Sequence, residues 1–480
     1  MKKGISFIMS LAIVGSCCML NNTVNDRCSA ITAVEIVELG TYEVDEKTSF
    51  EYTVDENGDT FIRRYTGTAE AVVIPSEIYG KKVNGISGSA FYNRADVTSV
   101  TIPDGITTIS MSAFEKCTGL TSITIPNDVK EISNSLFMDC SSLKSVTLPD
   151  SIEYIDYKAF KNCTALESIN IPQNLEYVMP DAFANTKWYD DQPDGMLITG
   201  KTVYKYKGSM PDNTSIVIPD GIKCIGGDAF ANCINLTSVT LPDTVESIEN
   251  NAFEKCINLT SVNIPNSVKN MGHYAFWDCQ ELTSVTLPEG IQLGYATFKG
   301  CVSLTSVTLP DSFQVVFPET FAGCTSLTSI TLPDNINEIS FNAFNGCTSL
   351  AEIVIPQNLT VILEGAFGDC TNLTKIVIPK NTVTIVDSAF EGHNQNLTIY
   401  GYKGSEAEKH ANDHNIKFVA LDAETTQKAA KTTAKATTTT KTTTTKSNSP
   451  ETGDKGSAGL VSAGLAASVL AFVSFKKRRK

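Results

Sequence analysis

The sequence has little of what most catalytic sites need. Its 480 residues include only four histidines and two tryptophans. It contains no glycine-rich phosphate-binding loop and no Gly-x-Ser-x-Gly nucleophile motif. No two of its cysteines have the two-residue spacing that is typical of a zinc-binding pair. These absences argue against an enzyme, and we expect no cofactor and no bound metal.

The sequence also lacks an excess of positive charge. It has 38 basic and 53 acidic residues, a formal net charge of −15. Without residues 1–30 and 453–480, which are treated below as processed ends, 29 basic and 51 acidic residues remain. A surface with that charge repels phosphate backbones, so we expect no nucleic-acid partner.

The first 30 residues have the pattern of an export signal. Lys2 and Lys3 precede an apolar run from Ile5 to Leu20, which is shorter than a typical membrane-spanning helix. We therefore predict a secretory signal peptide over residues 1–30. An alternative, which we rank second, is lipoprotein processing at Cys17.

The last 32 residues combine three features in a fixed order. Pro450-Glu451-Thr452-Gly453 precedes an apolar stretch at 456–475, and a basic tail ends the chain. The stretch is long enough to cross a bilayer, and the basic tail would stay in the cytoplasm. This order resembles the sortase sorting signal of Gram-positive surface proteins. The resemblance implies cleavage between Thr452 and Gly453, with Pro450 part of the motif, and covalent attachment to cell-wall peptidoglycan.

A segment of low complexity precedes the sorting signal. Residues 423–448 consist mostly of threonine and lysine with scattered alanine. Such a composition cannot bury enough apolar surface to form a core. We interpret residues 423–448 as a solvated linker and residues 449–480 as the sorting signal.

Between the two ends, the chain repeats itself every 23 residues. Each unit contains Ala-Phe or a close variant, then Cys three residues after the Phe, then Leu-Thr-Ser-Val-Thr-Leu-Pro. The spacing of the phenylalanines is 23 residues, with one step of 22 and one of 47. The repeated phenylalanines are Phe91, Phe114, Phe137, Phe160, Phe183, Phe230, Phe253, Phe276, Phe298, Phe321, Phe344, Phe367 and Phe390.

Within each unit, the apolar residues have the Leu-x-x-Leu-x-Leu spacing of a leucine-rich-repeat strand. The array over residues 72–399 resembles the BspA-type leucine-rich repeats of bacterial surface proteins. The resemblance implies a solenoid of about 13 repeats of 23 residues, with short stacked parallel β-strands. We expect Leu120, Ile123 and Ile125 to point inward, and Pro126 to end its strand because it has no amide hydrogen.

Ten of the fourteen cysteines occupy the same repeat position, and they are called the ladder cysteines here. The break at Thr186 leaves three on one side and seven on the other, so neither set can pair completely. A buried free cysteine behaves as a small apolar residue. We predict a column of unreactive core thiols: Cys117, Cys140, Cys163, Cys233, Cys256, Cys279, Cys301, Cys324, Cys347 and Cys370.

Both ends of a solenoid need covering, because an exposed last turn offers an unpaired strand edge. For residues 31–71 we predict a β cap that contains a hairpin around Asn57-Gly58. For residues 400–422 we predict an α/β cap, whose helix starts with a capping box formed by Ser405 and Glu408. We expect His410 and His414 to lie on this exposed helix without binding zinc.

The double step between Phe183 and Phe230 predicts an irregular unit at 187–215 that bears a hairpin. Its aromatic residues are Trp188, Tyr189, Tyr204 and Tyr206. They could form an exposed contact site for a protein or glycan, or they could pack inward beneath the hairpin.

These features favour an extracellular protein that is anchored to the cell wall of a Gram-positive bacterium. Resemblance and display suggest an adhesin-like protein that recognises a host or bacterial surface protein or a polysaccharide. The alternative is a structural display or spacer protein without a dedicated ligand. An enzyme that uses Asp190, Asp191 and Asp194 of the insert would need a catalytic pair that the sequence does not show.

Overall fold

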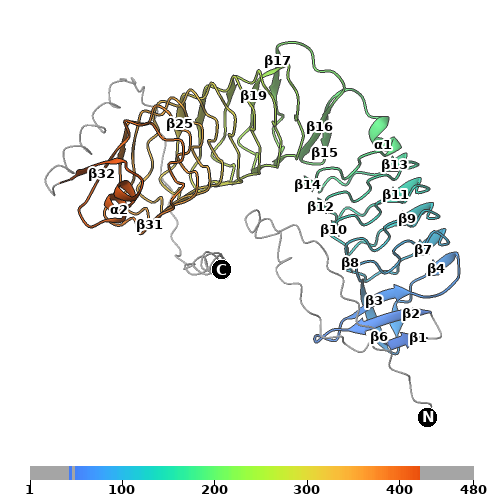
Figure 1. Ribbon diagram of the computed structural model, residues 1–480. Coiled ribbons are helices and arrows are strands. Elements are labelled where there is room, and N and C mark those ends of the chain that lie inside the picture. Colours follow the sequence, from blue (N-terminus) through green and yellow to red (C-terminus); the bar gives the residue numbers. More distant parts are fainter. Residues whose placement is uncertain (1–42, 46–48, 422–480) are drawn as a thin grey trace, which may run out of the picture. The chain divides into compact units, whose positions relative to one another are not determined.

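The computed structural model describes residues 43–45 and 49–421. Most of these residues stack as successive parallel turns (Figure 1). The predicted signal peptide, linker and sorting signal lie outside the described residues. The predicted solenoid is confirmed, with about 16 turns where the sequence predicted about 13. The phenylalanine count misses turns in which another ring takes the place of Phe, as Tyr65 and Tyr206 do.

Nearly every repeat places one short strand in what we call the first strand column, although the repeat of Phe321 has none. Strand β9 (Ser122–Thr124) pairs in parallel with β11 (Ser145–Thr147), so that Ile123 lies beside Val146. Ile123 is buried between two exposed neighbours, because successive side chains of a strand point to opposite faces. The predicted inward positions Leu120 and Ile125 are also buried.

The other strands of the first column have the same character, and equivalent repeat positions lie side by side. They are β4 (Ala71–Val73), β7 (Ser99–Thr101), β13 (Ser168–Ile169), β17 (Thr214–Val217), β19 (Leu236–Thr240), β21 (Ser261–Val262), β23 (Ser284–Thr286), β25 (Ser306–Thr308), β28 (Glu352–Val354), β30 (Lys375–Val377), β32 (Thr398–Gly401) and β33 (Lys417–Ala420).

A second strand column, which the sequence did not predict, lies in the other half of each turn. Its strands are mostly two residues long, too short to show the alternation by which a strand is recognised in sequence. They are β6 (Lys81–Ile86), β8 (Thr108–Ile109), β10 (Glu131–Ile132), β12 (Tyr154–Ile155), β14 (Tyr177–Val178), β16 (Thr202–Lys207), β18 (Cys224–Ile225), β20 (Ser247–Ile248), β22 (Asn270–Met271), β24 (Gln292–Leu293), β26 (Val315–Val316), β27 (Glu338–Ile339), β29 (Val361–Ile362) and β31 (Thr384–Ile385).

A sharp corner around the Ala-Phe pair returns the chain from the second column to the first. Every repeat has a left-handed backbone conformation two residues after its Phe, which explains why Asn, Asp and Gly recur there. The residues with this positive φ are Asn93, Lys116, Asp139, Asn162, Asn185, Asn232, Lys255, Asp278, Gly300, Gly323, Gly346, Asp369 and Gly392.

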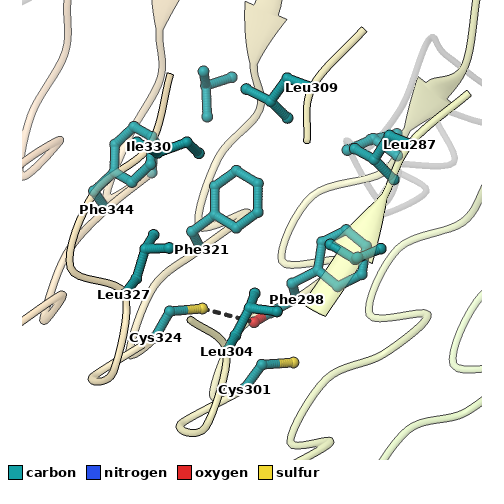
Figure 2. Close-up of a cluster of buried hydrophobic side chains, with 14 of the residues drawn as sticks. Leu287, Phe298, Cys301, Leu304, Leu309, Phe321, Cys324, Leu327, Ile330 and Phe344 are labelled. Atoms are coloured by element: carbon teal, nitrogen blue, oxygen red, sulfur yellow. Dashed lines mark hydrogen bonds between the residues drawn. The ribbon is translucent and has the colours of Figure 1, made fainter. Parts of the chain in front are cut away.

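The phenylalanine rings form a stacked column inside the turns. Neighbouring centroids from Phe91 to Phe183 and from Phe230 to Phe390 lie 5.0–5.9 Å apart, with nearly parallel planes. Figure 2 shows Phe298, Phe321 and Phe344 in successive turns, each beside an inward leucine or isoleucine. One turn cannot enclose these rings alone, so each turn depends on its neighbours for its core.

The predicted hairpin of the irregular unit is present. Strand β15 (Gly195–Thr199) pairs antiparallel with β16, and the short helix α1 (Lys187–Asp190), which was not predicted, precedes it. Thr186, which breaks the cysteine ladder, begins this helix: its Oγ1 accepts a hydrogen bond from the Tyr189 amide at 3.1 Å. The residue that replaces cysteine therefore starts the departure from the repeat.

At the N-terminal end, β2 (Phe50–Val54) and β3 (Thr60–Tyr65) form the predicted antiparallel hairpin, and β1 (Glu43–Asp45) pairs with β2. Strand β3 then pairs in parallel with β6, which itself pairs antiparallel with β5 (Glu77–Ile78). The hairpin thus adjoins the first turn of the second column. Its role as a cap remains a prediction.

At the C-terminal end, helix α2 (Glu406–Asp413) precedes β33, which pairs in parallel with β32. The predicted capping box is wrong in detail. The Ser405 hydroxyl makes no hydrogen bond to the helix, and the Glu408 carboxylate accepts instead from the Gly404 amide at 2.6 Å. The expectation of an exposed His410 is also wrong, because α2 packs this side chain inward and leaves it 3% exposed.

Candidate binding surface

The outer face of the first strand column is lined mainly by serine and threonine. The threonine that follows the inward leucine of many repeats donates its hydroxyl to a carbonyl of the preceding turn. Thr237 donates to Thr214 at 3.0 Å, Thr260 to Thr237 at 3.0 Å and Thr283 to Thr260 at 3.4 Å. These hydroxyls stabilise the stack itself, so this row offers little as a specific recognition surface.

The aromatic residues of the insert pack inward, the second of the two possibilities open from the sequence. Tyr204 is 5% exposed, and its hydroxyl accepts a hydrogen bond from the Phe183 amide at 3.0 Å. The rings of Trp188 and Phe183 lie 4.5 Å apart, and Tyr189 makes an edge contact with Tyr204. Tyr206 packs against Phe230 at 6.4 Å. An exposed contact site that includes Tyr204 is therefore wrong, because these rings fill the break in the phenylalanine column.

The ladder cysteines lie in the core, and only Cys233 is partly exposed. The other nine each donate a thiol hydrogen bond, 3.0–3.3 Å long, to the carbonyl of the Phe in the preceding turn. Figure 2 shows this contact between Cys324 and Phe298. Burial raises the pKa of the Cys279 and Cys324 thiols well above the ordinary value, so both stay protonated and unreactive near neutral pH.

The remaining predicted sites cannot be placed. Pro450, Thr452 and Gly453 lie outside the described residues, as does the predicted membrane span at 456–475. In the described part of the chain, no helix has the length and apolar character needed to cross a bilayer.

Within residues 43–45 and 49–421, no group of three or more His, Cys, Asp or Glu side chains is arranged to hold a metal ion.

A different set of aromatic residues gathers at the surface corner before the phenylalanines. The rings of His273 and Tyr295, one turn apart, have centroids 4.0 Å from each other. Tyr274 makes an edge contact with Tyr295 at 4.9 Å and lies 5.4 Å from Trp277. All four side chains are partly exposed.

Two glycines allow this close approach. A Cβ atom at Gly294 would lie 2.3 Å from the His273 backbone nitrogen, and one at Gly272 would lie 2.4 Å from that of Asn250. Only residues without a side chain can therefore precede His273 and Tyr295 in turns packed this tightly.

The next two turns also carry ring-bearing residues at this repeat position. Pro318 and Phe341 occupy the position of His273 and Tyr295, three residues before the repeat Phe. Backbone hydrogen bonds from Ala296 to Pro318 and from Glu319 to Phe341 hold these turns in register. Phe341 is 48% exposed. The aromatic strip, as we call it, comprises His273, Tyr274, Trp277, Tyr295, Pro318 and Phe341.

Tyr274 has an unusual backbone conformation. Its φ is 57°, in the left-handed region, where bulky residues are rare. The equivalent position has positive φ in most repeats, including those of Lys158, Ala296 and Glu319, so the repeat itself imposes this conformation. Among the residues at this position that have positive φ, only Tyr274 carries an aromatic ring.

The charged groups beside the strip are paired with one another. The Lys255 ammonium lies 2.9 Å from the Glu254 carboxylate and 4.6 Å from the centre of the Trp277 ring. Lys299 lies 2.7 Å from Glu319. Burial, with a smaller effect of Tyr295, raises the pKa of Tyr274 to about 12, and burial lowers the pKa of His273. The strip is therefore an uncharged aromatic surface near neutral pH.

The sequence contains a signal for this strip at an outward position of the repeat. When the repeats are aligned on their phenylalanines, the column three residues before the Phe reads Asn250, His273, Tyr295, Pro318 and Phe341. Four neighbouring ring-bearing residues at an outward position form a surface cluster once the turns stack. The repeat consensus does not reveal it, because the consensus consists of core residues and the outward positions vary from repeat to repeat.

Comparison with known proteins identifies the family of the repeats and the anchor motif. The family described as "BspA type Leucine rich repeat region" matches residues 84–190, 202–314 and 291–405, more than half of the chain. The "LPXTG cell wall anchor motif" matches residues 450–480. No match was found among curated proteins.

Several solved structures of bacterial leucine-rich-repeat proteins are similar. A cell-surface protein from Faecalibacterium prausnitzii is 26% identical, with 77% of this chain and 97% of that chain covered and a TM-score of 0.33. A leucine-rich-repeat protein from Bacteroides ovatus is 26% identical, with coverages of 80% and 98% and a TM-score of 0.38. The pneumococcal vaccine antigen PcpA is 18% identical, with coverages of 80% and 99% and a TM-score of 0.37.

Proposed function

Since the chain belongs to the BspA-type leucine-rich-repeat family and carries a Gram-positive cell-wall anchor at residues 450–480, we propose that it is an adhesin-like binding protein. It is displayed outside the cell, anchored to the wall through a sortase motif. In this role the solenoid presents a surface to a protein or glycan partner.

The aromatic strip is the observation that carries the proposal. Tyrosine and tryptophan are enriched at binding hot spots because they give a large contact area at a small cost in conformational entropy. Phe341 is 48% exposed and the rings of Tyr274, Trp277 and Tyr295 are partly exposed, an aromatic surface that a display protein without a partner does not need.

The serine and threonine rows on the outer face of the first strand column fit the alternative function, a display or spacer protein without a dedicated ligand. Thr237, Thr260 and Thr283 use their hydroxyls within the stack. A display protein without a ligand would need nothing more. The two functions therefore differ in whether the aromatic strip contacts a partner.

The test compares cells that produce the wild-type chain with cells that produce Thr452→Ala. Wall and medium fractions are probed for the protein, and the cells are tested for adhesion to immobilised matrix proteins, mucin and polysaccharides. We expect wall retention and adhesion for the wild type, and release into the medium with loss of adhesion for Thr452→Ala. Wall retention of the wild type without any adhesion would overturn the binding function and favour the spacer.

A further inference from the structure

The aromatic strip has a direction as well as a composition. Equivalent residues of successive turns supply its rings, so the strip runs parallel to the axis along which the turns stack. His273 and Tyr295 pack at 4.0 Å, and Pro318 and Phe341 follow at the same repeat position. A surface built in this way can contact a long partner at several places, whereas a small ligand would use only one of them.

The electrostatics of the strip disfavour anionic partners. Lys255 and Lys299, the cations beside the rings, already pair with Glu254 and Glu319. An anionic polymer would have to displace these carboxylates and would also meet a chain with a formal net charge of −15. The rings themselves are neutral near pH 7, so the partner that fits best is also uncharged.

The geometry of the rings favours one of two uncharged polymers, a polysaccharide, over the other, a proline-rich peptide. Proline-rich peptides dock in grooves between aromatic rings. Here the ring centroids of His273 and Tyr295 lie 4.0 Å apart, so these two rings leave no groove between them for a proline side chain. A sugar ring instead needs an aromatic surface, because its C–H groups carry a partial positive charge and the face of an aromatic ring is negative. The tyrosine hydroxyls and the paired lysines and carboxylates can then bind the sugar hydroxyls.

We infer that the aromatic strip is a binding site for an uncharged polysaccharide chain, laid along the stack across the turns from His273 to Phe341. This inference rests on the proposed binding function and specifies its partner. Tyr274, Trp277 and Tyr295 make the central contacts, and Pro318 and Phe341 extend the surface by two turns.

The repeats themselves supply variants that should fold. Neighbouring turns carry Asn251 where the strip has Tyr274, and Lys299 where it has Trp277. The double variant Tyr274→Asn/Trp277→Lys therefore places residues that this fold already accepts at both positions. The control is Tyr92→Glu, which removes a 43%-exposed ring at the repeat position of Trp277 in a distant turn and replaces it with the residue type of Glu115.

The full chain is tested by affinity electrophoresis in gels that contain mixed-linkage β-glucan, xylan, mannan or amylose, with hyaluronan and a proline-rich polypeptide as competing probes. We expect at least one neutral polysaccharide to retard the wild type and the Tyr92→Glu control equally. The double variant should bind at least about tenfold more weakly. Binding should persist in 0.5 M NaCl, because no ion pair with the ligand is involved.

Three results would overturn the inference. Retardation of the double variant to the same extent as the wild type would place the glycan elsewhere and leave the binding function intact. Binding of the proline-rich polypeptide alone, lost in the double variant, would make the strip a protein site. Failure of every neutral polysaccharide to bind a wild type whose cells still adhere would refute the glycan partner without refuting adhesion.

Discussion

The Sγ atom of Cys324 lies 3.3 Å from the carbonyl oxygen of Phe298, one turn earlier in the stack. The same carbonyl accepts the amide of Cys301 from its own turn at 3.2 Å. A carbonyl oxygen has two lone pairs, and a buried one gains from having both used. The ladder cysteine is thus a small apolar residue that also donates a hydrogen bond between turns, which explains its recurrence without any disulfide.

Removing one such thiol should weaken the stack. We expect Cys324→Ala to lower the free energy of unfolding by about 1–2 kcal/mol, from the lost hydrogen bond and the small cavity that it leaves. Urea denaturation of the full chain, followed by circular dichroism, measures the change. Cys233→Ala is the control, because the Cys233 thiol is partly exposed and its removal should cost clearly less. Equal losses for the two variants would contradict the structural role of the thiol contact.

The thiols should also differ in reactivity. Burial raises the pKa of Cys233 to about 11 and that of Cys370 to about 12, and Cys233 alone of the ladder is partly exposed. Since the thiolate is the reactive form, alkylation of the folded protein at pH 8 should modify Cys233 first. Mass spectrometry after timed iodoacetamide treatment locates the label. In unreduced, denatured protein all ten ladder cysteines should react, and near-absence of free thiols would contradict the ladder.

The C-terminal end should be sensitive to acid. The His410 ring lies 5.4 Å from Phe390 and 4.2 Å from His414, as the last member of the ring column. Burial and then His414 lower the pKa of His410 to about 4, an effect that Asp387 and Asp413 partly offset. The nearby His393 lowers this pKa slightly further.

The lowered pKa of His410 makes the folded state less stable as the pH falls. The folded state keeps His410 neutral, whereas the unfolded chain takes up a proton near pH 6.5. Its contribution to stability is therefore complete above about pH 6.5 and is lost as the pH falls from 6.5 to about 4. Hydrogen exchange of the α2 amides should accelerate over this range. His410→Phe, which keeps a ring on Phe390, should reduce the acceleration. Amides of β9 serve as the internal control, and an unchanged pH response of α2 in His410→Phe would refute the assignment.

The repeat could be predicted from the sequence because its core residues recur at fixed positions. Leu120, Ile123 and Phe114 fill the same places in their turn as their counterparts do elsewhere. The second strand column could not be predicted, because its strands are too short to show a period. The aromatic strip escaped notice since it exists only after stacking: Tyr274 and Tyr295 are 21 residues apart in sequence and in contact in the structure. For the insert, the sequence left two possibilities open, an exposed aromatic site or inward packing, and the burial of Tyr204 in the structure agrees with the second.

The first turn uses arginine where later turns use cysteine, and this exchange can be tested. Arg94 lies three residues after Phe91, and its guanidinium donates to the carbonyls of Tyr65 at 2.9 Å and Gly67 at 2.6 Å. It also pairs with Asp96 through two nitrogens and lies over the Tyr65 ring. A lysine ammonium cannot reproduce this planar set of donors.

We therefore expect Arg94→Lys to destabilise the N-terminal end by about 1–3 kcal/mol, the usual cost of leaving buried hydrogen-bond partners unsatisfied. Limited proteolysis of the full chain should show faster cleavage within residues 49–67, with cleavage elsewhere unchanged, because each turn contacts only its neighbours. Arg64→Lys, at an exposed position of the same segment, is the matched control and should behave like the wild type. If Arg94→Lys also leaves the cleavage rate unchanged, the guanidinium does not hold the hairpin to the first turn, and the ring contacts of Tyr65 with Phe50 and Phe91 must suffice.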